Sequence, residues 1–150
     1  MAVLRDKPYP GMNFVVDLGS GQTEGPEAGL AEVIFPSAQI NTVEYRNGNE
    51  RENSGRLIQT VTRYSNLVLK RGVIGSLTWY NWWSAARDGD QNIARNVVVN
   101  LLNEDRSNVE LSWKFYNARP VEFGFSPLNA LANDALMEKL EIAFERFEIE

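Results

Sequence analysis

The chain contains no cysteine and no histidine in its 150 residues. The missing cysteines exclude disulfides, thiolate metal sites and a cysteine nucleophile. The missing histidines remove the commonest general base and the commonest ligand of transition metals. We therefore expect a protein that is not an enzyme, with no catalytic, cofactor or metal site.

Long apolar runs and an excess of positive charge are also lacking. No segment is apolar over the length needed to cross a bilayer, and the first ten residues lack the apolar stretch of a secretory signal. The net charge of −5 argues against a surface that coats nucleic acid, because such a surface would be basic. We expect one domain, 1–150, that is made and assembled in the cytoplasm and does not insert into membranes.

What the chain does contain is a series of short β-branched and aromatic segments separated by glycine, proline and asparagine. Residues 1–12 form an arm that prolines and a glycine keep irregular. Loops are expected at 19–29, which is rich in glycine, and at 47–55, which is polar and solvated. The segments expected to be strands are 13–18, 30–40 with a break or bend at Pro36, 42–46, 57–62, 66–70, 95–102, 109–116 and 119–125.

One helix is predicted, from Ser76, a good N-cap, to a left-handed stop at Gly89. It carries three of the four tryptophans of the chain. Apolar residues form two neighbouring stripes, so the helix should be largely covered. The residues expected to form the structural core of this helix are Leu77, Trp79, Tyr80, Trp82 and Trp83.

The C-terminal segment fits two structures. Leu136, Leu140, Phe144 and Phe147 have helical spacing, whereas the alternation of Leu140, Ile142 and Phe144 with polar residues fits a strand. Propensity favours the helix, because Ala, Leu, Met, Glu and Lys are good helix formers. The residues alone leave both structures open.

Two motifs imitate ligand sites. Residues 88–92 read like the start of a calcium loop, but Ile93 and Val99 stand where the glycine and glutamate of such a loop belong. Residues 19–21 read like the start of a dinucleotide fingerprint, but Glu24 replaces its third glycine and no helix follows. A polar turn and a loop are the better interpretations.

Several other groups have a structural and a chemical interpretation. The acidic pair Glu104–Asp105 and the glutamates after residue 137 suit solvated or subunit-facing edges better than acid–base chemistry. Lys70 and Arg71 could hold a phosphate, although adjacent cations at a strand end more often form surface or interface ion pairs. The tryptophans could stack on sugars, but their helical spacing favours core packing.

Four ordered blocks together resemble the tail tube (inner tube) proteins of contractile phage tails and phage-tail-like contractile injection systems. Three local departures, at 19–29, at 35–37 and just before the third block, affect loops rather than the fold. The blocks are Tyr9-Pro10 with Asn13-Phe14-Val15-Val16, then Val43 to Gly48, then Tyr64 to Gly72 with Trp79 and Trp82-Trp83, and finally Asn96 to Val99 with Trp113-Lys114-Phe115, Asn117 to Pro120, Asn133 and the last glutamate-rich segment.

The resemblance implies a mainly β fold, in which two packed antiparallel sheets form a small β-barrel with one flanking α-helix. It also makes the last segment a strand. Hexameric rings would stack into a hollow conduit that is driven through a target envelope. The implied partners are other copies, a sheath, a baseplate and spike, a tube terminator or cap, and a cargo of effector protein or DNA. The implied location is a phage tail or tail-like particle, released by lysis or by a dedicated machine.

Two alternatives stay open: a secreted ring protein of a type VI secretion system, and a tryptophan-based carbohydrate-binding β module. For the tube, the polar loop is the candidate for reaching a neighbouring ring, and the cation pair is a candidate for subunit contacts. The candidate contact residues are Asn47, Gly48, Asn49, Glu50, Arg51, Glu52, Lys70 and Arg71.

Overall fold

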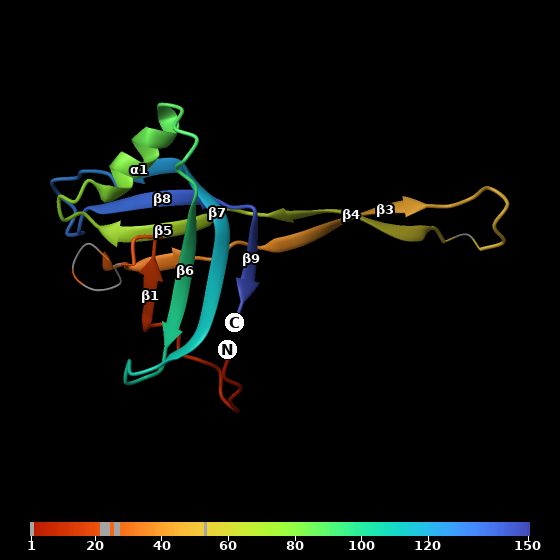
Figure 1. Ribbon diagram of the computed structural model, residues 1–150, viewed down its shortest axis with the longest axis horizontal. Helices are drawn as coiled ribbons and strands as arrows, with labels where there is room; N and C mark the ends of the chain where they lie inside the picture. Colours follow the sequence, from red (N-terminus) through yellow and green to blue (C-terminus); the bar gives the residue numbers. More distant parts are fainter. Residues whose placement is uncertain (1, 22–24, 26–27, 53) are drawn as a thin grey trace.

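The fold consists of antiparallel strands and one short helix, as Figure 1 shows. The computed structural model describes residues 2–21, 25, 28–52 and 54–150. The predicted mainly β class with one helix is confirmed. In chain order the elements are β1 (Phe14–Asp17), β2 (Glu32–Ile34), β3 (Ala38–Tyr45), β4 (Arg56–Tyr64), β5 (Leu67–Gly72), α1 (Thr78–Arg87), β6 (Arg95–Leu102), β7 (Val109–Phe125), β8 (Met137–Ala143) and β9 (Arg146–Ile149).

The long strand β7 divides the main sheet into two layers. Its first part pairs with β6 and β9, and its second part, 119–125, pairs with β8. We call β1, β6, the first part of β7 and β9 layer A, and the second part of β7 with β8, β5 and β2 layer B. In Figure 1, β5 and β8 run across the view while β6 and β9 run down it. Among the described residues, pairing does not join β1 to β2, so these strands end the path.

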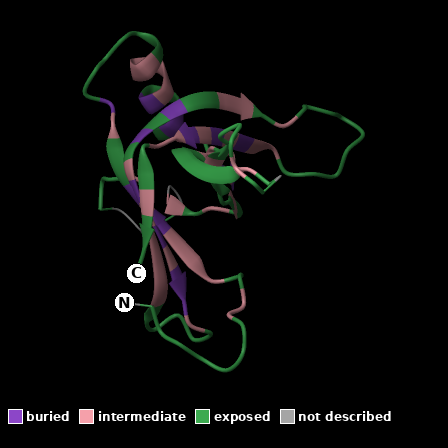
Figure 2. Cartoon of the chain, turned by 90° about the vertical axis from the view of Figure 1, so that its right-hand side faces the viewer, coloured by how far each residue is buried: buried purple, intermediate pink, exposed green. Residues whose placement is uncertain are grey.

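The core lies between the two layers and under the helix. Strands β5 and β8 alternate buried and partly exposed residues, the period-two pattern of a sheet with one covered face. Their buried leucines and Ile142 meet valines of β6 and Phe115 of β7, and Trp79 and Trp82 of α1 complete the cluster. Figure 2 shows the buried stretches along the strands where the layers meet.

Two boundaries differ from the sequence prediction in detail. Helix α1 has Leu77 rather than Ser76 at its N-cap, and the Ser76 hydroxyl instead accepts a long 3.4 Å bond from the Thr78 N–H. The left-handed stop at Gly89 is confirmed by its φ of 88°. Segments 109–116 and 119–125 form one strand, because Asn117, with a φ of 53°, redirects the chain and pairing resumes beyond it.

The C-terminal segment is β8 and β9 rather than a helix. Leu140 and Ile142 fall on the buried face of β8, which pairs with β5 on one side and β7 on the other. Two ladders of backbone hydrogen bonds and a covered face outweigh a helix propensity difference of a few tenths of a kcal/mol per residue. The strand that the resemblance implied is therefore confirmed.

The two motifs that imitate ligand sites are turns in the described residues. The Asp17 carboxylate accepts 2.9 Å hydrogen bonds from the N–H groups of Gly19 and Gly21, so these donors already have an acceptor. Asp90 likewise accepts from the Asn92 N–H at 2.9 Å. Glu24 and most of the predicted 19–29 loop lie outside the described residues.

Candidate assembly surfaces

A long hairpin reaches out from the body of the molecule (Figure 1). Strands β3 and β4 form a two-stranded sheet that pairs from Ala38 opposite Tyr64 to Tyr45 opposite Arg56, with a register shift between Ile40 and Thr42. Strand β2 precedes β3 and pairs with β5, which follows β4, so the ladder in layer B continues outward beyond the break at 35–37. We call β3, β4 and the loop between them the arm.

The root of the arm is tied to the body. The Ser65 N–H donates to the Ser37 carbonyl at 3.1 Å, and the Ser37 N–H donates to the Ser65 hydroxyl at 2.8 Å. The Tyr64 ring lies 5.3 Å from Phe144 and 5.4 Å from Phe147, between centroids. Backbone and aromatic contacts together therefore set the direction in which the arm leaves the body.

The rest of the arm exposes apolar side chains. Ladder pairing places Val43 and Ile58 opposite each other on one face, while Ile40 belongs to the other. A two-stranded ribbon is marginally stable alone in water, and a large exposed apolar surface marks an interaction site. The exposed apolar residues of the arm are Ile40, Val43, Tyr45, Leu57, Ile58 and Val61.

The tip of the arm holds the loop predicted to contact a neighbouring ring. Arg46 organises this loop, because its Nε donates to the Glu52 carbonyl at 2.7 Å and its Nη2 to the Glu50 carbonyl at 2.8 Å. Arg56 forms a 3.1 Å ion pair with Glu50. The structure thus brings six of the predicted contact residues together at the end of the arm: Asn47, Gly48, Asn49, Glu50, Arg51 and Glu52.

Lys70 and Arg71 point to opposite faces of β5. Lys70 lies on the outer face of layer B, 3.7 Å from Glu32. Arg71 is only 1% exposed, forms an ion pair with the buried Glu138, and stacks on Trp79 with its guanidinium carbon 4.2 Å from the ring centroid. The interpretation of Arg71 as a surface or interface cation is therefore wrong for this subunit, because strand alternation turns it into the core.

Only one stripe of the helix is fully covered. Trp79 and Trp82 are buried, and the Trp82 indole N–H donates to the Ile93 carbonyl at 2.8 Å. Leu77 is 62% exposed and Tyr80 41% exposed, while Trp83 is half-buried. The expected core position of Leu77 and Tyr80 has to be corrected, because α1 packs through one face and turns the other outward.

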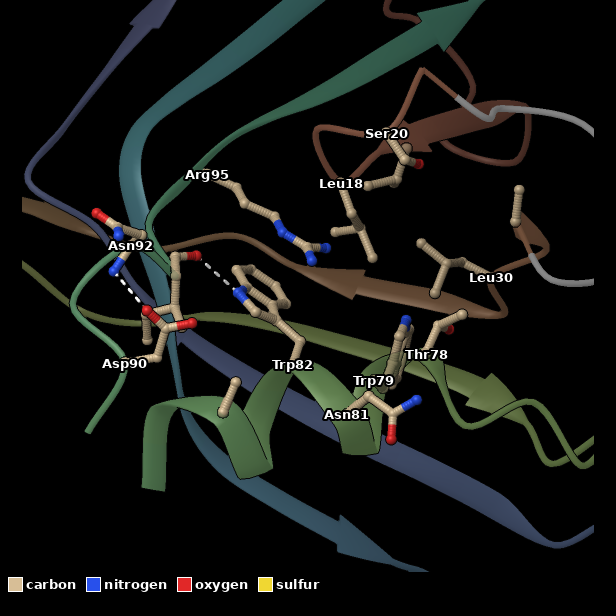
Figure 3. A pocket seen from close by; sticks show the side chains of 14 residues that line it. Leu18, Ser20, Leu30, Thr78, Trp79, Asn81, Trp82, Asp90, Asn92 and Arg95 are labelled. Carbon is tan, nitrogen blue, oxygen red and sulfur yellow. Dashed lines mark hydrogen bonds between the residues drawn. The ribbon is translucent and has the colours of Figure 1, made fainter. Parts of the chain in front are cut away.

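A hollow of about 450 Å³ lies between α1, the end of β1 and residues 28–30, and Figure 3 shows its lining. The guanidinium carbon of Arg95 lies 4.8 Å from the centroid of the Trp82 ring. Because Trp79 and Trp82 are buried, they present no open ring face of the kind that stacks on a sugar.

Neither metal chemistry nor a membrane span is evident in the part of the chain that the structure describes. Its acidic residues form no group of three or more that could hold a metal ion. No helix there is long and apolar enough to cross a membrane.

The two outer strands of layer B are a feature that the sequence analysis did not single out. Among the described residues, β2 pairs only with β5, and the 119–125 part of β7 pairs only with β8. Exposed Ile34 lies in one of these edge strands, and exposed Val121 and Phe125 lie in the other. Edges that carry unpaired backbone groups and apolar side chains are places where another chain can add. The available sequence signal was the presence of the apolar residues Val121 and Phe125 in a segment predicted to be a strand.

The family model of the T4-like virus tail tube protein gp19 matches residues 10–148. The chain belongs to this tail tube family. The predicted resemblance is thereby confirmed, and a tube subunit is supported over a carbohydrate-binding module. None of the curated proteins gives a sequence match to this tail tube protein.

Solved structures show the same fold. A chain from the anti-feeding prophage baseplate has a TM-score of 0.82 at 22% identity, with 97% of each chain covered. A chain from the sheath–tube complex of the extracellular contractile injection system PVC has a TM-score of 0.83 at 19% identity, covering 97% of this tail tube protein and 93% of that chain. Hcp1 from Flavobacterium johnsoniae has a TM-score of 0.54 at 14% identity, covering 91% and 93%.

Proposed function

We propose that the chain is the structural subunit of a hollow inner tube in a contractile injection system or contractile phage tail, and that it has no enzymatic activity. The observation that carries the proposal is the pair of open edges on layer B. Membership of the tail tube family supports it, as does the likeness to the baseplate and sheath–tube chains, which exceeds the likeness to Hcp1.

The strand directions support ring closure. Successive strands β7, β8, β5 and β2 are antiparallel, so β2 runs opposite to β7. When β2 of one copy lies beside the second part of β7 in the next, antiparallel pairing continues across the seam. A closed ring removes both edges of every copy, which an open chain of copies cannot do. We propose a ring with sixfold symmetry.

The arm would join rings to one another. Its apolar faces are exposed in the single subunit and its root is held by Tyr64 and Ser65, so it presents a directed surface to a neighbouring copy. The six tip residues, from Asn47 to Glu52, would make the outermost contacts. A contact between different surfaces of identical copies repeats and so builds a stack.

The wider assembly is proposed by analogy. The matched chains come from structures of a baseplate, a tube-terminating cap and a sheath–tube complex. We expect this tube to start at a baseplate and spike, to end at a terminator or cap, to lie inside a sheath, and to hold an effector or DNA. Assembly would take place in the cytoplasm, with release of the particle by lysis.

Negative-stain electron microscopy of the purified chain tests the proposal. We expect rings with sixfold symmetry, and stacked tubes at higher protein concentration. A protein that remains monomeric at high concentration and shows no ring would overturn it. Binding of soluble glycans by such a monomer would favour the carbohydrate-binding alternative instead.

A further inference from the structure

The outer face of layer B carries a patch of charged residues. Lys70, Lys139 and Glu141 alternate along β5 and β8 with buried residues, so they point away from the core. Residues of β2 and β7 that stand opposite outward-facing positions share this face. The side chains that form ion pairs here keep between 22% and 61% of their area exposed. The charged residues of this face, which we call the charged face, are Glu32, Lys70, Arg119, Glu122, Lys139 and Glu141.

Most of the charges lie in two neighbouring rows, and Arg119 lies in the row beyond them, opposite Ala143. Lys70 stands opposite Lys139 across the β5–β8 ladder, and in the next row Glu122 stands opposite Glu141. Like charges directly opposite each other are unfavourable in a sheet. Contacts between opposite charges offset the repulsion between these like charges. The Lys139 Nζ lies 3.7 Å from Glu122 and 3.9 Å from Glu141, and the Lys70 Nζ lies 3.7 Å from Glu32.

A hydrogen bond to Glu141 also stabilises the charges on this face. The Asn66 amide donates to Glu141 at 2.9 Å, and this bond holds the pKa of Glu141 below its usual value. Glu141 therefore stays charged beside Lys139 at neutral pH. With three carboxylates, two ammonium groups and the guanidinium of Arg119, the charged face carries no net charge per subunit.

The position of the charged face in a ring follows from what covers the other face of layer B. The core cluster, Trp79 of α1 and layer A all lie against that other face. Figure 1 shows helix α1 and the strands of layer A next to β5 and β8. When layer B closes into a ring, the face that carries α1 and layer A must be on the outside, because these elements would not fit within the ring. The charged face then points to the axis.

We propose, on the basis of the tube function above, that the charged face is the wall that cargo meets, and that its paired charges let a charged cargo slide without being held. A wall of one sign would retain a polymer of the opposite sign through many simultaneous contacts. The electric fields of two opposite charges a few ångströms apart largely cancel at distances beyond the Debye length, which is about 8 Å at physiological salt.

Charge variants test the sliding wall. Assembled tubes of the wild-type chain should retain little of a fluorescent oligolysine and little of a single-stranded oligonucleotide. Lys70→Gln/Arg119→Gln/Lys139→Gln leaves only carboxylates on the wall and should raise oligolysine retention at least about tenfold. Glu32→Gln/Glu122→Gln/Glu141→Gln leaves only the two lysines and Arg119 and should raise oligonucleotide retention similarly. Equal retention of both probes by all three tubes would overturn the proposal.

Cysteine labelling tests the location independently, because the chain has no native cysteine. Glu122→Cys places a thiol on the charged face, and Asp88→Cys, at a side chain 68% exposed against 61% for Glu122, is the matched control beside the helix. In assembled tubes, a small maleimide should label both variants. A maleimide attached to a protein wider than the bore should label only Asp88→Cys.

The outcomes separate this inference from the tube function. Labelling of Glu122→Cys in intact tubes by the wide reagent would put the charged face outside and overturn the inference alone. Lys139→Cys serves as a second variant if Glu122→Cys does not assemble. Absence of tubes from the wild-type chain would overturn the tube function and the inference with it.

Discussion

Arg71 and Glu138 stand opposite each other across the β5–β8 ladder and form an ion pair inside the core. The two side chains are 1% and 4% exposed. The Arg71 guanidinium also lies over Trp79, and its Nη2 lies 3.3 Å from the Thr78 hydroxyl. One buried charge pair therefore connects the strand, the neighbouring strand and the first turn of the helix.

Breaking this pair should destabilise the subunit strongly. Glu138→Ala leaves a buried guanidinium without its carboxylate, and Arg71→Ala leaves a buried carboxylate, so we expect each variant to lose about 3–5 kcal/mol of unfolding free energy. Urea denaturation followed by tryptophan fluorescence measures the loss. The apolar double variant Arg71→Met/Glu138→Leu should recover most of it, because no charge is left to desolvate. A double variant as unstable as the single ones would contradict this account.

Trp82 is expected to act through packing. Trp82→Ala removes a buried indole and its hydrogen bond to Ile93. We expect this variant to lose about 3–5 kcal/mol of unfolding free energy and to give less soluble protein. Trp82→Phe keeps most of the packing and should cost less. Thermal denaturation of the two variants beside Trp83→Ala, at a half-buried position, gives the comparison. Equal losses for Trp82→Ala and Trp83→Ala would show that burial is not the cause.

The tip of the arm should affect stacking but not folding. Replacing 46–55 with a two-residue Asn-Gly turn shortens the hairpin while preserving a favourable connection. We expect a subunit with unchanged circular dichroism that forms rings and stacks poorly in electron micrographs. Arg46→Ala, which removes only the two hydrogen bonds that organise the loop, should give an intermediate tube length. Tubes of normal length from the shortened hairpin would refute the role.

The contact between Arg5 and Glu104 should weaken at low pH. The Arg5 guanidinium hydrogen-bonds Glu104 at 2.8 Å and lowers the pKa of that carboxyl from its ordinary value. A lowered folded-state pKa means that the stabilisation is complete above the ordinary value and is lost as pH falls through the lowered one.

Carbon-13 NMR titration of the Glu104 carboxyl measures this effect. Its pKa should lie below the ordinary value in the wild-type chain and should rise toward that value in Arg5→Gln. Lys7→Gln is the matched control, because it removes a cation two residues from Arg5 in the sequence and leaves the pair with Arg5. An identical pKa in the wild type and Arg5→Gln would show that Arg5 is not the cause.

Much of the strand pattern could be predicted from residue order. The alternation along 66–70 and 109–116 predicted β5 and the first part of β7, because a strand with one buried face needs apolar residues at every second position. The break at Pro36 and the stop at Gly89 followed equally from local backbone constraints. These features depend on neighbours in sequence, and the four ordered blocks that indicated the family are of the same kind.

Three properties depended on contacts between distant residues. The C-terminal segment became β8 because β5 and β7 offered it two ladders, which its own helix propensity does not reveal. Arg71 went into the core because Glu138, 67 residues away, faces it there. Leu77 and Tyr80 stayed exposed because α1 packs on only one side.

The amino-acid sequence alone thus determined the class of fold, the family and the absence of thiol and imidazole chemistry, since these follow from composition and local order. The tertiary structure decided which of two adjacent cations is buried, where the arm projects and which face of layer B is charged. Burial and pairing are set by the partner across the ladder, and that partner is known only once the chain has folded.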